Sequence, residues 1–208
     1  MDANASGKTK RDWLAFDRSD YLVTKILLAI VVLVSLLFDL VAPVVDAVRN
    51  APLPVSYTTK VSSGVLLPRG ATHDGEVTME PLLNGATLGE RLVQATPGLL
   101  GGAVSIAVAT LLFQLLRTTQ AGDPFTRRNV RRINTMALVV GIGGSLAHLA
   151  QGIADNAMYT TGRLPRPDTL FFEMTLPLTP LVVMMVIFLI GETFRRGVKL
   201  RDDLEGLV

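Results

Sequence analysis

The chain has 208 residues, of which 49% are hydrophobic, and a formal net charge of +2. Its charged residues are gathered into a few segments with long apolar runs between them, a pattern typical of a membrane protein rather than a soluble domain. Cysteine is absent, which excludes disulfides, thiol catalysis and thiolate metal sites.

Four apolar runs are each long enough to cross the roughly 30 Å hydrocarbon core of a bilayer as a helix. Their continuous apolarity excludes a β-barrel, whose strands would alternate in polarity. We therefore predict an all-α membrane protein: a four-transmembrane-helix bundle with a small extracytoplasmic β-containing loop region between helices 1 and 2. The predicted spans are residues 21–41, 97–116, 135–154 and 174–194.

The segments between the spans predict the orientation. The tails, residues 1–20 and 195–208, and the loop 117–134 carry thirteen Lys and Arg residues, whereas the segments 42–96 and 155–173 carry six. Cytoplasmic segments of membrane proteins are the ones enriched in Lys and Arg. We therefore place both termini and the basic loop 117–134 in the cytoplasm, and the segments 42–96 and 155–173 outside.

The extracytoplasmic region 42–96 is too long for a simple connector. Alternation of apolar and polar residues from Val55 to Ser62, and again from Glu76 to Glu80, predicts two half-buried strands. Thr87 and Glu90 have the spacing of a capping box, which predicts a short helix from Leu88 towards Pro97. Because so small a region cannot be stable alone, we expect it to lean on the outer helix ends, the second outer loop or another copy of itself.

The second and third spans are rich in small residues at the spacing of helix contacts, including Gly98 and Gly102 in one and Gly141, Gly144 and Gly152 in the other. Small side chains allow helix backbones to approach closely, which is how helices associate in lipid. We interpret these residues as packing positions.

Polar residues follow the same face of the third span. His148, Gln151 and Asp155 recur there at steps of three or four, and Gln114 on the second span is a further polar neighbour. We expect this face to point inward, where the residues are either structural hydrogen-bonding groups or a site for a proton or solute. No cluster has the spacing of a metal site, and no motif predicts a cofactor.

The cytoplasmic loop contains a turn, Gly122-Asp123-Pro124, followed by Phe125 and the helix cap Thr126. We predict that Phe125 contacts the membrane interface or a partner. The basic residues that follow are predicted to contact anionic lipid headgroups or a partner: Arg127, Arg128, Arg131 and Arg132. The patch is too small and too close to the membrane for direct nucleic-acid binding.

The C-terminal tail has apolar residues at helical spacing, namely Leu200, Leu204, Leu207 and Val208. Such a tail can lie on the membrane or dock on a partner, and fraying in water is the third alternative.

Both cytoplasmic stretches resemble the bacterial four-span family called domain of unknown function 2975. The residues that carry the resemblance are Gly122, Pro124, Phe125, Asn129, Arg132 and Ile133 in the loop, and Phe194, Arg195, Arg196, Gly197, Leu200 and Val208 at the end. The resemblance implies a multi-pass protein of the bacterial inner (plasma) membrane, often encoded beside a small helix-turn-helix regulator. It supplies no activity and no catalytic residues.

From the sequence we expect a non-enzymatic membrane protein whose outer region senses or binds something and whose cytoplasmic loop and tail contact a partner. The alternative is a small transporter or channel subunit that uses His148, Gln151 and Gln114. Because the spans are not broken at the midplane, such a transporter would need a homo-oligomer to form a path.

The charge bias predicts a labelling pattern in intact cells. A Thr72→Cys variant should react with an impermeant thiol reagent, because residue 72 lies outside, and a Thr119→Cys variant should not. The wild-type chain has no cysteine, so it supplies the unlabelled control. The opposite pattern would contradict the predicted orientation.

Overall fold

The computed structural model describes residues 18–55, 57–60, 76–162 and 177–206. Within them, four helices are long and apolar enough to cross a membrane: Ser19–Val48, Leu88–Gln120, Arg127–Met158 and Leu178–Leu204. The first consists of α1 (Arg18–Ser35), the π-helical segment η1 (Leu36–Val41) and α2 (Ala42–Val48), and the second is α3 (Leu88–Gln120). The third consists of α4 (Arg127–Leu138), the π-helical segment η2 (Val139–Gly143) and α5 (Gly144–Thr160), and the fourth is α6 (Leu178–Glu205).

The first helix continues past residue 41, where the predicted span ends, although Pro43 follows. Proline has no N–H and its ring crowds the carbonyl group four residues earlier, here that of Asp39. The π-helical segment η1 precedes this proline, and the amide of Ala42 donates to the carbonyl of Leu37, five residues back. Such a local π adjustment satisfies backbone groups around a proline, so the helix does not end there.

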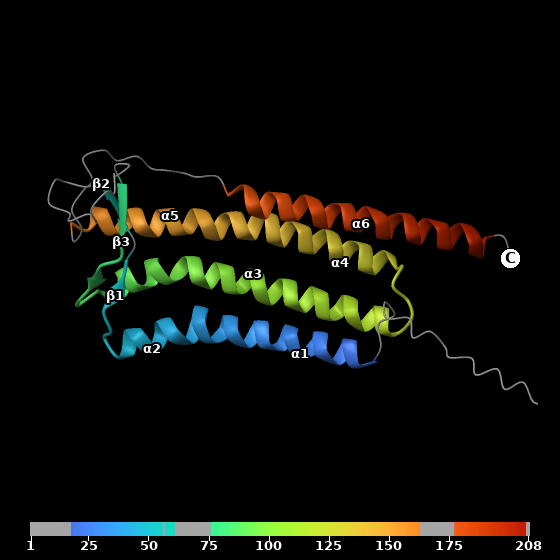
Figure 1. The fold of residues 1–208 in the computed structure, drawn as a ribbon, viewed down its shortest axis with the longest axis horizontal. Coiled ribbons are helices and arrows are strands. Elements are labelled where there is room, and N and C mark those ends of the chain that lie inside the picture. The colour runs from blue at the N-terminus through green and yellow to red at the C-terminus, as the bar shows by residue number, and fades with distance from the viewer. Residues whose placement is uncertain (1–17, 56, 61–75, 163–176, 207–208) are drawn as a thin grey trace, which may run out of the picture.

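The four helices lie side by side in an open row (Figure 1). Helix α3 packs against α1 and η1 on one side and against α5 on the other, while α6 packs against α4 and η2. Helices α1 and α6 therefore form the two edges of the row, rather than closing the bundle that the sequence predicts. Little of each helix is buried within the chain, so most apolar side chains are left for lipid or another chain to cover.

Helix α6 is displaced along its own axis relative to α5. It begins at Leu178 and places Pro180 against Gly144, so the last four turns of α5 extend beyond its start. Its other end runs past the predicted span as one continuous helix to Glu205. The tail is thus helical as predicted, but it continues α6 instead of forming a separate segment.

Short strands lie together at one end of the helices, between α2 and α3 in the chain, and we call this end the hairpin end. β2 (Tyr57–Lys60) pairs antiparallel with β3 (Glu76–Met79), with Tyr57 opposite Met79, and β1 (Leu53–Pro54) pairs with β4 (Leu82–Leu83). The predicted paired strands are therefore confirmed, and residues 61–75 lie outside the described part. Val55 packs against Met158 of α5, each 1% exposed, so this region does lean on a helix end.

The capping box at Thr87 is also confirmed. The amide of Glu90 donates to the Thr87 hydroxyl (3.3 Å), and the amide of Thr87 donates to the Glu90 carboxylate (2.7 Å). The helix that it starts is not short, however, because α3 runs unbroken through Pro97 to Gln120. A proline removes one backbone hydrogen bond, and that loss alone does not end so long a helix.

Glycines predicted as packing positions mark the closest helix contacts. A Cβ atom on Gly102 would lie 2.8 Å from Oδ2 and 2.9 Å from Cβ of Asp39, on η1. Gly141 meets Met184 in the same way, and Gly144 meets Pro180. Gly152 has open space around it among the described residues. A Cβ on Gly98 would lie 3.8 Å from Oδ1 of Asp39, an ordinary contact. Four of the five predicted glycines therefore lie at helix contacts, and Gly152 lies where α6 does not reach.

Replacing Gly102 should separate α1 from α3. In Gly102→Ala the new methyl group meets the backbone end of the Asp39 side chain, so overpacking should lower the free energy of unfolding by about 1–3 kcal/mol. Thermal unfolding in detergent measures the change. The control is Gly101→Ala, where a Cβ would meet nothing within 4 Å. Equal stability of the two variants would show that the Asp39–Gly102 contact does not hold α1.

Candidate functional site

The loop between α3 and α4 begins with a helix end that requires glycine. Gly122 has φ +84°, a left-handed conformation that costs glycine little. Its amide donates to the carbonyl of Thr119 (3.0 Å), and the amide of Asp123 donates to the carbonyl of Thr118 (3.2 Å). These two bonds form a Schellman motif, and Pro124 then prevents the helix from continuing. The Gly-x-Pro turn thus has a purely local cause.

Asn129 is the buried centre of the same loop, with 0% of its surface exposed. Its amide Nδ2 donates to the carbonyl of Pro124 (2.9 Å). Its Oδ1 accepts from the hydroxyl of Thr118 (2.8 Å) and from Nη1 of Arg132 (2.9 Å). Arg132 Nη1 also donates to the carbonyl of Gln114 (3.2 Å). One side chain therefore joins the end of α3, the loop and the first turns of α4.

Thr126 caps α4, as predicted, by accepting a hydrogen bond from the amide of Asn129 (3.2 Å). The preceding residue, Phe125, turns towards α6. Its ring lies 5.4 Å from that of Phe194, centroid to centroid, and occupies the space where a side chain at Gly197 would stand. Phe125 thus binds the chain's own last helix, although it remains partly exposed.

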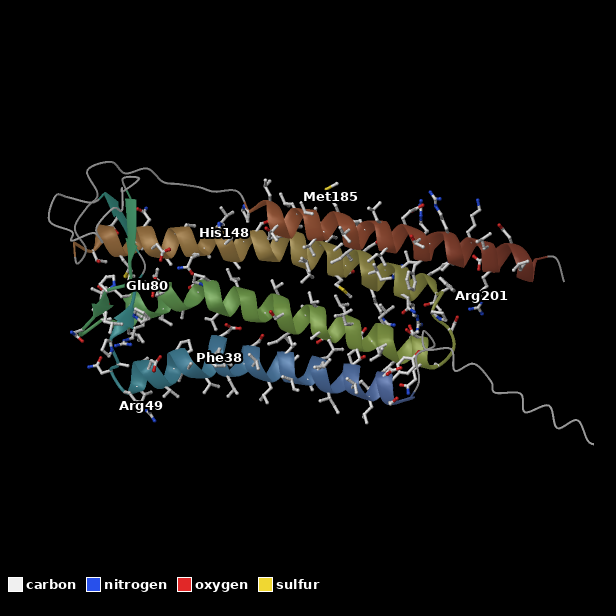
Figure 2. The ribbon with its side chains drawn as sticks, viewed as in Figure 1. Phe38, Arg49, Glu80, His148, Met185 and Arg201 are labelled. Atoms are coloured by element: carbon white, nitrogen blue, oxygen red, sulfur yellow. The ribbon has the colours of Figure 1, made fainter. Side chains whose placement is uncertain are left out.

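Two exposed ion pairs join the end of α6 to this loop and to the start of α4. Arg127 donates to Asp202 (3.0 Å), and Arg201 pairs with Asp123. Figure 2 shows Arg201 at this end of α6, next to the loop that joins α3 and α4. We call residues 118–132 together with Phe194, Gly197, Arg201 and Asp202 the clasp.

Sequence reasoning predicted Phe125, Arg127 and Arg132 as contacts for lipid or a partner, and the structure engages all three inside the clasp. The sequence analysis did not identify Thr118, Asp123 or Asp202 as residues that bind within the clasp. A glycine at residue 197, inside a helix and four residues before Arg201, was the available signal for the Phe125 contact.

Other predicted contact residues remain on the surface of the clasp end. Arg128 and Arg131 are exposed and have no hydrogen-bond or ion-pair partner among the described residues. Leu200 and Leu204 are 65% and 66% exposed, one helical turn apart on α6. Leu207 and Val208 lie outside the described residues.

The polar residues that the sequence predicts as one intramembrane site do not all lie together. Gln151 Nε2 (3.0 Å) and Gln94 Nε2 (3.4 Å) both donate to Asp155 Oδ1 near the hairpin end. Gln114 instead lies beside Arg132 at the clasp, and the 20 residues of α3 between Gln94 and Gln114 span about 30 Å. The residues of the predicted intramembrane site are thus divided between the hairpin end and the clasp end of the helices.

His148 and Gln151 are exposed, whereas the sequence predicts an inward-pointing face. The reason is the displacement of α6, since this face meets α6 at Gly144 and extends beyond its start. His148 lies on α5 near that start (Figure 2). Among the described residues it has no hydrogen-bond partner.

Asp39 lies further from the end of its helix than the predicted span indicates. The sequence places it near the end of a span, but the helix continues for nine more residues, about 14 Å. Its carboxylate adjoins Gly98 and Gly102, and no hydrogen bond or ion pair of its side chain occurs among the described residues. The predicted span ends at residue 41, whereas the π-helical segment η1 carries the helix past Pro43 to Val48.

No group of three or more His, Asp or Glu side chains within the described ranges could hold a metal ion. Comparison with known proteins gives one family match: the family model with the description "Protein of unknown function (DUF2975)" matches residues 82–208. The matched stretch contains the whole clasp and excludes α1. No curated protein and no solved structure matches the chain.

Replacing Asn129 should destabilise the clasp more than a typical polar substitution. Asn129→Ala removes the partners of Thr118, Arg132 and the Pro124 carbonyl, and unsatisfied buried groups cost about 1–3 kcal/mol each. We expect the free energy of unfolding in detergent to fall by at least about 2 kcal/mol. Asn156→Ala is the control, because Asn156 has no hydrogen bond among the described residues. Similar stability of both variants would argue against the clasp as a structural unit.

Proposed function

Because the chain belongs to the family described as Protein of unknown function (DUF2975), whose description names no activity, we propose a function from the geometry of the chain itself. The protein is a non-enzymatic interaction protein of the bacterial inner membrane. Its clasp presents a docking helix to a cytoplasmic protein, and its hairpin end lies outside. The excess of Lys and Arg at the clasp end supports this orientation.

The observation that carries the proposal is the exposed pair Leu200 and Leu204 on α6. Residues 178–191 are uncharged, and Glu192 is the first charged residue of the helix. Leu204 lies thirteen residues beyond Gly191, about 20 Å along the axis, whereas the headgroup layer is only about 5–8 Å thick. Lipid would therefore not cover these leucines if α6 projects straight out of the bilayer.

The clasp prepares this helix for binding. Its ion pairs and the Phe125 ring hold α6 against α4 and the loop, so the leucine pair stands on an ordered helix. A preorganised helix loses less conformational entropy when a partner binds than a frayed tail does. An apolar face on a helix fits an apolar groove of the partner.

Helix α3 provides a physical connection between the two ends. At the hairpin end Arg91, which is buried, donates to the carbonyl of Ala51 and the side chain of Asn50. At the other end, Thr118 of the same helix bonds Asn129 in the clasp. A shift of α3 caused by a ligand at the hairpin end would reach the clasp through about 40 Å of continuous helix.

The transporter alternative receives less support. Gln114 stands about 30 Å from Gln94 and Asp155, so the polar residues offer no single site. His148 has no polar partner within the described part of the chain. A path between copies of the chain would be needed to use it.

The docking proposal predicts a loss of partner capture. The partner to test first is the small helix-turn-helix regulator that the family resemblance implies. In the full chain, Leu200→Ser with Leu204→Ser should weaken its binding more than about a hundredfold, because each buried leucine contributes about 1.5–3 kcal/mol. Pull-down from the native membrane, followed by titration with the purified regulator, measures this.

Asp203→Ser is the matched control for that experiment. Asp203 is exposed on the same turn of α6 and has no partner among the described residues, so capture should persist. Undiminished capture by the double leucine variant, together with loss of a solute flux in His148→Ala, would favour the transporter instead.

A further inference from the structure

A basic groove runs between α4 and α6 at the clasp end, and its lining does not include the proposed docking residues Leu200 and Leu204. Its volume is about 300 Å³. The residues that line it are Arg127 and Val130 from α4, and Arg195, Val198, Lys199 and Asp202 from α6. Val198 is 8% exposed and belongs to the buried contact between the helices, so the base of the groove is apolar.

The charges around the groove do not cancel. Arg127 pairs with Asp202 (3.0 Å), and Arg195 pairs with Glu192 outside the lining (2.7 Å). Both of these pairs are largely exposed, and each leaves N–H groups of the guanidinium available. Lys199 has no partner among the described residues. Three cations against one carboxylate therefore give the lining a net positive charge, which favours an anion.

The position of the groove along α6 identifies the kind of anion. Arg195 lies four residues beyond Gly191, the last residue of the uncharged stretch, which is about 6 Å. Lys199 lies one turn further, but side chains on a helix lean towards its N-terminus, which brings the ammonium group back towards the apolar stretch. Both cations thus reach the level at which lipid phosphates stand in a bilayer.

We propose that this groove binds the headgroup phosphate of an anionic phospholipid. Lys199 and Arg195 donate charge-assisted hydrogen bonds to the phosphate oxygens, Arg127 adds positive charge at the far side of the groove, and the apolar base limits the water that competes for the phosphate. The excess of positive charge disfavours a zwitterionic lipid, whose choline group would meet the same cations. A bound lipid would join α4 to α6 beside the clasp.

Binding of single lipids to the full chain tests the proposal. The protein is purified in detergent, titrated with phosphatidylglycerol, phosphatidylcholine or soluble glycerol phosphate, and examined by native mass spectrometry. We expect retention of phosphatidylglycerol in preference to the other two. Lys199→Gln should raise its apparent Kd about fivefold, the equivalent of about 1 kcal/mol for one cation, and Lys199→Arg should retain the binding.

Arg196→Gln is the matched control. It removes the same charge from the preceding helical turn. Arg196 pairs with Glu192, as Arg195 does, but does not line the groove. The apparent Kd of this variant should remain close to that of the wild type. Equal losses in Lys199→Gln and Arg196→Gln would overturn the proposal in favour of general surface attraction, and equal binding of glycerol phosphate would overturn the assignment to a lipid.

Discussion

Close approach of helix backbones at glycine is the constraint on which this structure depends. At the α1–α3 contact Gly102 leaves room for Asp39, at the η2–α6 contact Gly141 leaves room for Met184, and at the clasp Gly197 leaves room for Phe125. In lipid the hydrophobic effect does not drive helices together, so contact depends on such close packing and on hydrogen bonds. Each of these glycines therefore serves a particular neighbour. The contacts join each helix to its neighbour, and the helices form a row with α1 and α6 at its edges (Figure 1).

Continuity of the helices is the second feature that shapes the molecule. The π-helical segment η1 carries the first helix past Pro43, and α3 passes Pro97 without ending. One consequence is that Asp39 adjoins Gly102 well inside the helix. Another is that α3 extends from the Arg91 contacts at the hairpin end to Thr118 in the clasp. The two ends of the molecule are connected by one element instead of by several jointed ones.

The clasp gives a physical reason for the residues that carry the family resemblance. Gly122 and Pro124 end α3, Asn129 satisfies groups from three segments, and Phe125 needs the glycine at residue 197. These residues secure the exposed surface next to them. That surface divides into an apolar pair, Leu200 and Leu204, and a basic groove between α4 and α6.

The sequence by itself determined the elements whose cause is local. Apolar runs long enough for a bilayer predicted the four helices, alternation predicted the strand pair β2–β3, and the spacing of Thr87 and Glu90 predicted the start of α3. The Gly-Asp-Pro turn and the Thr126 cap are equally local, since their hydrogen bonds join residues at most five apart.

Only the tertiary structure decided which helix faces meet, because no local pattern records how far one helix is displaced along another. That displacement leaves His148 exposed, because the polar face of α5 extends beyond the start of α6. Packing of the loop against α3 and α6 likewise makes Arg132 and Phe125 internal contacts of the clasp. Residues far apart in sequence, such as Arg127 and Asp202, come together through long-range packing, which charge and periodicity within one segment do not specify.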